Sequence, residues 1–517
     1  MILNRRSGSL ILLIILAAAL ALRSIGLELK PTHFDEGING NFVFRMWSDG
    51  FYRYDPNNFH GPLYFYILQL AETVFGFGIF GYRFATGLLS LAIIYIIGSH
   101  RRFVGNSALW AAAVYAVSPA SVFYSRYAIH ETLFILSHVA FAFGYLLWRE
   151  ERSNKAWAWM AAAVVTAVTT KETFFIFFGT WAIAIFVDQF ATKLFKLKVT
   201  AEPTPPKASP VSERVAINLV AAFVTLALFT GFFMNLQGAQ DMFTALMIWT
   251  KTGTGATGHE KEFRYWIDLM NRYEWPFLVA LVLTPVVYFR ARSRAMRLFT
   301  LVGFGTWLAY SLIPYKTPWL ILNILWPLSF VFGFLICGRA RWLEEWLPKK
   351  YYLVRLLFIV ALLFTMVSSI RMTMWLNFDH YNDLKEPYVY VQTTDQFKVV
   401  MDTISALVEK RPEERGMSLA VLNQDPWPMP WVLSRFPRLS WGKAGTTPLA
   451  GFDVVLADAS DTAVVESGLQ GRYLIMPFQI RDAYQIGHAY LIESKFKDVV
   501  PKGTPDRTFG VEQAVKK

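Results

Sequence analysis

An acidic pair, Asp35-Glu36, follows the first long apolar run of the sequence, within the segment His33-Phe34-Asp35-Glu36-Gly37. A charged carboxylate beside the hydrocarbon of a bilayer is unfavourable, so ionisable residues at such places often carry a function. Asp35 could act as a general base that takes a proton from a nucleophile, with Glu36 supporting it. Alternatively, Asp35 caps a helix that begins near Gly37.

A further carboxylate, Glu131, lies in the short polar segment 125–131 between two apolar runs. If Asp35 and Glu131 lie on the same side of a membrane, they could share a divalent metal ion, or one could act as base while the other orients it. The structural alternative is an exposed ion pair between Glu131 and Arg126, which contributes about 0–1 kcal/mol.

Two lysines also stand at the ends of apolar runs: Lys171, which precedes Glu172, and Lys316 in the segment Tyr315-Lys316-Thr317-Pro318-Trp319. An ammonium group at the membrane surface suits the phosphate of a lipid-linked substrate. A single lysine there could equally extend its charge into the interface without binding anything. A tyrosine and a tryptophan beside Lys316 are also typical of interfacial anchors.

Two histidines and one tyrosine are weaker candidates for substrate contacts: His60 in the segment His60-Gly61-Pro62, His259 before Glu260, and Tyr315. Either histidine could join Asp35 or Glu131 around a metal ion. No ligand spacing such as HExxH accompanies them, however.

Long apolar runs must position all of these residues. About 18 apolar residues suffice to cross the hydrocarbon of a bilayer, and the chain has roughly eleven such stretches. They are 10–27, 82–98, 107–124, 133–148, 157–170, 174–190, 215–234, 276–289, 298–313, 318–337 and 353–370. Charged residues make up 17% of the chain, against about 25% in soluble domains. The sequence therefore predicts a polytopic helical membrane protein.

Basic residues cluster in alternate loops, which predicts the orientation in the membrane. The clusters are Arg5-Arg6, Arg101-Arg102, Arg149/Arg152/Lys155, Lys193/Lys196/Lys198, Arg290/Arg292/Arg294 and Arg339/Arg341/Lys349/Lys350. The positive-inside rule makes this side, and the N-terminus, cytoplasmic. Asp35, Glu131, Lys171 and Lys316 then face the outside. The net charge of +12 lies largely in these loops, so nucleic acid is not an expected partner.

Composition divides the chain into a membrane domain, 1–371, and a soluble domain, 372–517. The membrane domain has two long outer loops, 34–81 and 237–275, with amphipathic spacing. In the second domain, β-like runs at 388–391, 418–422 and 454–456 alternate with an amphipathic stretch at 395–408, which predicts a small α/β domain. An odd number of spans places this domain outside the cytoplasm.

These residues, in this order, resemble the GT-C superfamily of membrane glycosyltransferases. The stretch HFDEG is similar to the FDE segment of protein O-mannosyltransferases and to the DE pair of lipid A aminoarabinose transferases. FHGPLYFYI is similar to their HPPLYY-like stretch, and SPASVFYSRYAIHETLF to their SP…YSR segment. The segment YKTPWL resembles a branch of archaeal and bacterial relatives associated with flippase activity.

The resemblance implies a sugar donor on polyprenyl phosphate and inversion by direct displacement. Asp35 would be the base, Glu36 its support and Glu131 the second acidic position, with metal dependence open. Arg126, Lys171 and Lys316 would bind the donor phosphate. The sugar is not implied, nor is the class of acceptor (protein, lipid or glycan).

Two rival functions remain: a flippase or transporter of lipid-linked sugars, and a non-catalytic subunit of a glycosylation complex. Transporters place charged residues at mid-membrane on broken helices. Here the polar residues gather at the outer ends of the apolar runs, which favours the enzyme.

Overall fold

The computed structural model describes residues 5–198, 200, 206, 208–254, 258–337, 350–481 and 485–510. Contacts divide the chain into two compact units. The helical unit comprises Met1–Leu27 and Asp49–His380, and the sheet unit comprises Glu28–Ser48 and Tyr381–Lys517. Residues 28–48, which carry Asp35-Glu36, thus belong to the same compact unit as the C-terminal part of the chain.

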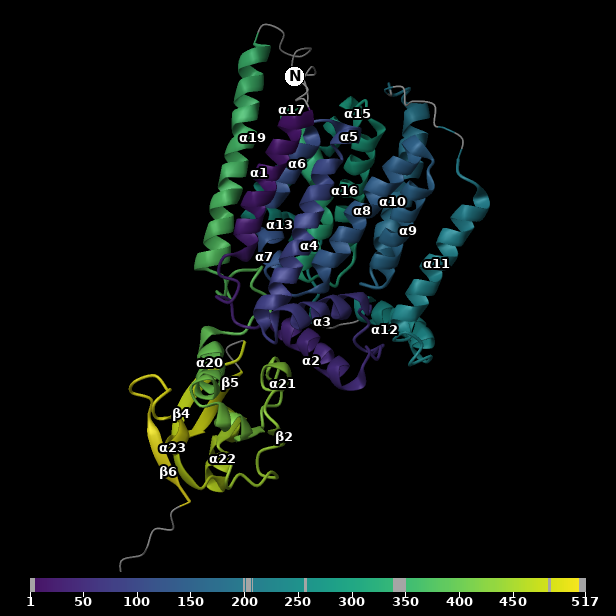
Figure 1. Ribbon diagram of the computed structural model, residues 1–517. Coiled ribbons are helices and arrows are strands. Elements are labelled where there is room, and N and C mark those ends of the chain that lie inside the picture. Colours follow the sequence, from purple (N-terminus) through teal and green to yellow (C-terminus); the bar gives the residue numbers. More distant parts are fainter. Residues whose placement is uncertain are drawn as a thin grey trace, which may run out of the picture. The chain divides into compact units, whose positions relative to one another are not determined.

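The helical unit is drawn in purple through green in Figure 1. Its helices are α1 (Arg5–Ser24), α3 (Leu63–Phe75), α4 (Ile79–Ser99), α5 (Arg101–Val104), α6 (Ser107–Ala116), α7 (Pro119–Ser125), α8 (His130–Glu151), α9 (Asn154–Val168), α10 (Phe174–Leu194), α11 (Val211–Phe229), α12 (Gly238–Thr254), α13 (Tyr265–Tyr273), α14 (Trp275–Val282), α15 (Thr284–Arg290), α16 (Arg294–Leu312), α17 (Leu322–Cys337) and α19 (Tyr351–Met374). A 3₁₀ turn, Pro318–Ile321, precedes α17, and a π-helical turn, Trp375–Asp379, follows α19.

Seven stretches in the described part of the chain are helical, long and apolar enough to cross a membrane: Arg6–Ser24, Ile79–Val104, His130–Glu151, Phe174–Leu194, Val211–Phe229, Pro318–Cys337 and Tyr351–Asp379. The pair α6 and α7, bent by 60°, makes an eighth if it forms one span. The other three predicted spans fall on α9, on the broken pair α14 and α15, and on α16. These helices are shorter, interrupted or charged, so the count of eleven stays a prediction.

Polar residues at the starts of several helices set where those helices begin. Ser118 Oγ accepts a hydrogen bond from the Ser121 amide, and Pro119 stands at the first position of α7. Ser153 caps α9 and Ser293 caps α16 in the same way. Each cap accepts a hydrogen bond from a backbone amide that has no acceptor within the helix. Proline at the first helical position costs no hydrogen bond, because the amide at this position would have no acceptor within the helix.

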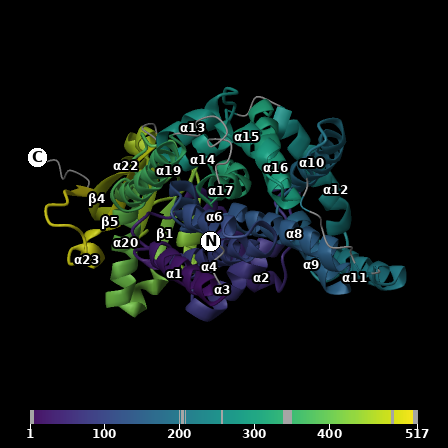
Figure 2. The same ribbon diagram turned by 90° about the horizontal axis from the view of Figure 1, so that it is seen from above.

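Within the helical unit, α17 packs against α6 and α16, and most of its surface is buried. On the other side, α8 packs against α4 and α9, and α9 packs against α11, so that α8, α9 and α11 lie in a row in Figure 2. A buried ion group joins α10 to α16: Asp188 Oδ1 accepts from Arg297 Nε at 2.7 Å, and Asp188 Oδ2 lies 3.1 Å from Arg294 Nε.

The basic clusters that predict the orientation lie at one end of the long helices. Arg149 is in the last turn of α8 and Lys193 in the last turn of α10, whereas Glu131 is in the first turn of α8. Arg339, Arg341 and Lys349 lie outside the described residues, as does much of the proline-rich segment 200–212.

The sheet unit contains a mixed sheet whose strand order is β2-β1-β3-β5-β4-β6. Its elements are α2 (Phe34–Asp49), α20 (Asp395–Lys410), β1 (Ser418–Val421), α21 (Met429–Val432), β2 (Arg438–Trp441), β3 (Val454–Asp458), α22 (Thr462–Gly468), β4 (Gly471–Gln479), β5 (Ile486–Ile492), α23 (Glu493–Phe496) and β6 (Asp506–Phe509), with 3₁₀ turns at Pro412–Gly416 and Ala459–Asp461. β1 pairs in parallel with β2 and β3, and the remaining pairs are antiparallel.

Alternation along the strands divides the core of the sheet unit into two layers. Leu419 and Leu456 join a cluster with the apolar face of α20, whereas Ala420 and Val455 join a cluster with Val465 of α22. Because successive strand residues face opposite sides, each strand supplies both layers. The strands predicted at 418–422 and 454–456 and the amphipathic stretch at 395–408 are confirmed as β1, β3 and α20.

The strand predicted at 388–391 is wrong, because this segment forms turns and lies outside the sheet. The Val389 amide donates to the Glu386 carbonyl, and Val391 has a positive φ of 55°. Its other polar groups bind residues 31–33: Tyr390 O contacts His33 Nε2 at 2.7 Å, and Gln392 Nε2 donates to Pro31 O at 2.9 Å. An apolar run gives no signal of this competing partner, which lies some 360 residues earlier in the chain.

Candidate active site

Asp35 and Glu36 lie in the first turn of α2, in the sheet unit, and their environments differ. The Glu36 side chain is fully buried, and its Oε2 accepts a hydrogen bond from the His33 amide at 2.9 Å. The Asp35 side chain is 31% exposed. The helix begins at Phe34, so the predicted cap by Asp35 of a helix starting near Gly37 is wrong, and Glu36 binds the amide ahead of the helix instead.

His33 occupies a defined orientation next to Asp35. Its Nδ1 accepts from the Asp35 amide at 3.0 Å, so Nδ1 carries no proton. Its Nε2 lies 2.7 Å from the Tyr390 carbonyl, which accepts the proton on that nitrogen. These two contacts fix the orientation of the imidazole, with Nδ1 4.0 Å from Asp35 Oδ2.

Close packing fixes α2 on residues 427–431 of the same unit. A Cβ on Gly37 would overlap Pro428, and a Cβ on Gly40 would overlap the ring of Trp431. Phe34 lies edge-on to Trp427 at 6.4 Å, and the guanidinium of Arg481 lies 4.5 Å from the Phe34 ring. The C-terminal part of the chain therefore positions the helix that carries Asp35.

Glu131 and Lys171 form a buried ion pair in the helical unit. The Lys171 ammonium donates to Glu131 Oε2, and Asn323 Nδ2 donates to Glu131 Oε1 at 2.6 Å. The side chains of Glu131 and Lys171 are 1% and 6% exposed. The Lys171 charge is thus balanced by Glu131.

Arg126 does not pair with Glu131, so the exposed ion pair considered from the sequence is wrong. Its guanidinium donates to the carbonyls of Leu22, Ile25 and Gly26 at 3.0, 2.5 and 2.9 Å, and it lies 4.7 Å from the Phe378 ring. A cation at the last carbonyls of a helix favourably meets the negative end of the helix dipole. Arg126 therefore holds the C-terminal end of α1.

His60 lies beside Glu172, with Nδ1 3.0 Å from Oε2. The His60 side chain is 28% exposed and the Glu172 side chain 3%. Backbone hydrogen bonds join the two segments, because the Gly61 amide donates to Thr170 O and the Leu63 amide to Thr169 O. A Cβ on Gly61 would overlap the Thr169 backbone, so this pairing requires glycine. The buried ring of His130 lies 4.6 Å from that of His60.

Lys316, His259 and Tyr315 come together where the segments 259–261 and 314–316 pair. The Lys316 amide donates to His259 O, and Glu260 and Tyr315 form a β-bridge. The Lys316 ammonium donates to Lys261 O at 3.0 Å and to Ile313 O at 2.6 Å, and burial lowers its pKa. The His259 ring packs edge-on against Tyr315 at 5.2 Å.

The proposed metal ligands do not gather within either unit. Among the residues that the structure describes, no three His, Cys, Asp or Glu side chains lie close enough to hold an ion. Asp35 belongs to the sheet unit and Glu131 to the helical unit. Metal dependence stays a prediction.

Known proteins share this fold and part of this sequence. Residues 59–201 match the family model of dolichyl-phosphate-mannose-protein mannosyltransferases. The structure of ArnT from Cupriavidus metallidurans bound to undecaprenyl phosphate is similar with a TM-score of 0.63 and 14% identity, over 92% of this chain and 97% of that one. The chain therefore has the fold of this membrane glycosyltransferase structure.

A second solved structure agrees with this assignment of the fold. It is the archaeal oligosaccharyltransferase AglB from Archaeoglobus fulgidus in complex with an inhibitory peptide and a dolichol-phosphate, with a TM-score of 0.53 and 10% identity, over 96% of this chain and 75% of that one. No curated protein sequence matches the chain significantly. The apolar helices and this fold are those of a multi-pass membrane protein, and the C-terminal part of the chain forms a sheet domain.

Sequence reasoning missed three polar residues of the helical unit. Asn323 holds Glu131, Glu172 holds His60, and Glu274 accepts from Ser118 Oγ at 3.0 Å and from the Ala120 amide at 2.7 Å. Asn323 gave a signal, because it is a polar residue inside the apolar run 318–337. Glu274 stands immediately before an apolar run, as Asp35 stands after one. The same argument about a carboxylate beside the bilayer could have made Glu274 a candidate functional residue.

Proposed function

We propose that this chain is a GT-C glycosyltransferase that moves a sugar from a polyprenyl-phosphate donor to an acceptor on the extracytoplasmic face, with Asp35 as the base. The observation that carries the proposal is the contrast within the acidic pair. Glu36 is buried and bound to the chain, whereas the Asp35 carboxylate reaches solvent beside a histidine whose ring two hydrogen bonds hold in place. A general base needs this accessibility to reach the proton that it abstracts.

The proposed reaction is a single displacement. Asp35 takes the proton of an acceptor hydroxyl or amide while the acceptor atom forms a bond to the anomeric carbon. The bond from that carbon to the phosphate oxygen breaks, and polyprenyl phosphate leaves with the electron pair and a further negative charge. One base is sufficient, because no glycosyl-enzyme intermediate forms.

Cations of the helical unit are proposed to stabilise the charge on the leaving phosphate. Lys316 suits this role best, since its ammonium has three N–H donors and two of them bind carbonyls. Lys171 is paired with Glu131, and Arg126 binds three carbonyls at the end of α1. These two cations would therefore act on the phosphate indirectly: Lys171 would position Glu131, and Arg126 would position α1. ArnT with undecaprenyl phosphate and AglB with dolichol-phosphate support a donor of this lipid class.

The proposal that the site faces the extracytoplasmic side depends on which residues lie at the two ends of the long helices. Basic residues occupy the ends of α8 and α10 that hold Arg149 and Lys193, and Glu131 occupies the opposite end of α8. By the positive-inside rule the basic ends are cytoplasmic, which puts Glu131 and Lys171 at the extracytoplasmic ends.

The decisive experiment measures lipid release. Purified protein is incubated with polyprenyl-phosphate hexoses labelled in the sugar, with host membranes as the source of acceptor. Asp35→Asn is expected to lower the rate of polyprenyl phosphate release by about 10²–10⁴-fold, because the amide cannot accept the proton. The matched control is Asp49→Asn, which removes an exposed carboxylate from the other end of the same helix and should leave the rate unchanged.

Two results would contradict the proposal. Full turnover of Asp35→Asn would remove Asp35 from the base role. Movement of labelled lipid across proteoliposomes without cleavage, in the wild type and in Asp35→Asn alike, would instead establish a flippase.

A further inference from the structure

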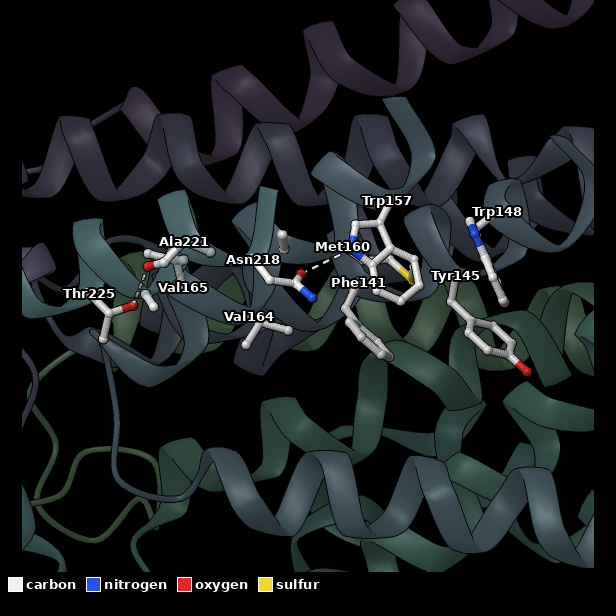
Figure 3. A pocket seen from close by; sticks show the side chains of 12 residues that line it. Phe141, Tyr145, Trp148, Trp157, Met160, Val164, Val165, Asn218, Ala221 and Thr225 are labelled. Carbon is white, nitrogen blue, oxygen red and sulfur yellow. Dashed lines mark hydrogen bonds between the residues drawn. The ribbon is translucent and has the colours of Figure 1, made fainter. Parts of the chain in front are cut away.

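A groove runs between α8, α9 and α11 in the helical unit, and none of the residues that line it belongs to the candidate site. Its volume is about 600 Å³, within the range of about 300–1,000 Å³ typical of ligand sites. Figure 3 shows Phe141 and Trp148 of α8, Trp157 of α9, and Asn218 and Thr225 of α11 along it. Phe141 and Trp148 are seven positions apart, so the groove extends along about 10 Å of helix. An alkyl chain fits such a long, apolar space.

One end of the groove is aromatic and basic. Trp148 and Trp157 stand there, with the guanidinium of Arg152 4.0 Å from the Trp148 ring and that of Arg214 5.6 Å from the Trp157 ring. This is the end of α8 that the distribution of basic loops predicts to be cytoplasmic. Paired tryptophans and arginines at the membrane interface are the side chains that contact lipid head groups.

Two buried donors at this end have no hydrogen-bond partner within the described residues: Trp148 Nε1 and Arg214 Nε. Buried donors are nearly always satisfied, so a missing acceptor calls for an explanation. Phosphate and ester oxygens are acceptors that a bound lipid would supply.

The acidic residues around this end already have partners. Glu150 Oε2 and Glu151 Oε1 each accept from Arg102 at 2.7 Å, and Glu213 accepts from Asn154. Arg152 and Arg214 form no ion pair among the residues that the structure describes. Arg149 and Lys155 lie at the same end, so five basic residues (Arg102, Arg149, Arg152, Lys155 and Arg214) stand there against three acidic ones (Glu150, Glu151 and Glu213), and the net charge of this end is +2, from 5 − 3.

We propose that this groove binds one anionic glycerophospholipid of the cytoplasmic leaflet, with an acyl chain along α8, α9 and α11 and its phosphate at Arg152 and Arg214. The apolar walls select an alkyl chain, and the uncompensated arginines select a head group with net negative charge over a zwitterionic one. The bound lipid would also fill the space beside α11, a helix that the protein itself covers over a small part of its surface.

The test measures lipid retention. Purified, delipidated protein is mixed with equal amounts of phosphatidylglycerol and phosphatidylcholine of identical acyl chains, and bound lipid is counted by native mass spectrometry. The wild type is expected to retain one phosphatidylglycerol at least tenfold over phosphatidylcholine. Arg152→Gln/Arg214→Gln should abolish this preference, whereas Lys193→Gln/Lys196→Gln, which removes equal charge from the end of α10, should keep it.

A second pair of variants tests the groove itself. Ala161→Leu/Ala222→Leu fills the groove and should abolish retention of either lipid, while Ala216→Leu, on α11 but outside the lining, should not. Equal retention of both lipids by the wild type would overturn the proposal, and so would retention unaffected by the filling variants. Displacement of phosphatidylglycerol by undecaprenyl phosphate at equal concentration would assign the groove to the donor instead. None of these outcomes depends on sugar transfer, so the proposed function stands or fails separately.

Discussion

The contact between Glu131 and Lys171 changes the role that can be assigned to each of the two side chains. Each could be interpreted alone as a catalytic carboxylate or a phosphate-binding cation. The ion pair between them leaves a buried, nearly neutral group that Asn323 completes. Two such charges in a membrane-embedded bundle are stable only together, because each alone would be a buried charge without compensation.

Removing one partner of this pair should therefore lower the free energy of unfolding more than removing both partners does. Lys171→Met is expected to cost about 3–5 kcal/mol of stability by leaving Glu131 uncompensated. The double variant Glu131→Gln/Lys171→Met should recover much of that loss in thermal unfolding. Because Glu131 is proposed to act at the site, the double variant should not recover turnover.

The control is the exposed pair between Arg102 and Glu150, where Arg102→Gln should cost no more than about 1 kcal/mol. Recovery of full turnover by the double variant of the buried pair would show that Glu131 serves stability alone.

His259 should make the paired segments 259–261 and 314–316 sensitive to acid. Burial lowers the pKa of this imidazole from its ordinary 6.5, Lys261 lowers it further and Glu260 opposes the change. Between the folded pKa and 6.5 the unfolded chain binds more protons than the folded one, so stability is complete above pH 6.5 and falls as the pH drops through this window. The midpoint of thermal unfolding of His259→Phe, which keeps a ring against Tyr315, should fall less between pH 7.5 and 5 than that of the wild type.

Lys261→Met offers an internal check, because loss of this cation should raise the pKa of His259 and reduce the acid sensitivity. Identical pH profiles for the wild type and His259→Phe would contradict the assignment.

At the scale of the element, α2 owes its position to two glycines. Gly40 meets the ring of Trp431 so closely that a methyl group there has no room. Gly40→Ala should therefore displace α2 and Asp35 with it, which lowers turnover strongly and exposes residues 28–48 to protease. Gly179→Ala on α10 is the matched control, since a Cβ there meets nothing within 4 Å and alanine favours the helix. Unchanged turnover of Gly40→Ala would mean that α2 does not position the base.

Some elements could be predicted from local patterns and others could not. The amphipathic spacing of 395–408 and the short β-like run at 418–422 are properties of each segment itself, and both gave the right element. The segment 388–391 has the composition of a strand, but this region of the chain binds residues 31–33 instead of joining the sheet. Its conformation therefore depends on residues that are distant in the sequence. The partners of Glu131 lie 40 and 192 positions away, so spacing could predict the carboxylate but not the pair.

At the scale of the whole molecule, composition predicts an apolar and a polar part, because membrane solubility acts on every residue of a span. It could not predict that residues 28–48 group with 381–517. That grouping comes from close packing of two glycines on α2 against Pro428 and Trp431. Hydropathy carries no information about how closely two segments can pack.

The grouping of α2 with the end of the chain sets an order of assembly during synthesis. The ribosome makes residues 28–48 early, and the segments that hold α2 come roughly 330 residues later, which at ~5–20 residues per second is a delay of tens of seconds. Throughout that interval Asp35 has no support, even though the first membrane helix is already complete. A nascent or prematurely terminated chain would therefore insert its first helix in the membrane without the contacts that position Asp35, the proposed base.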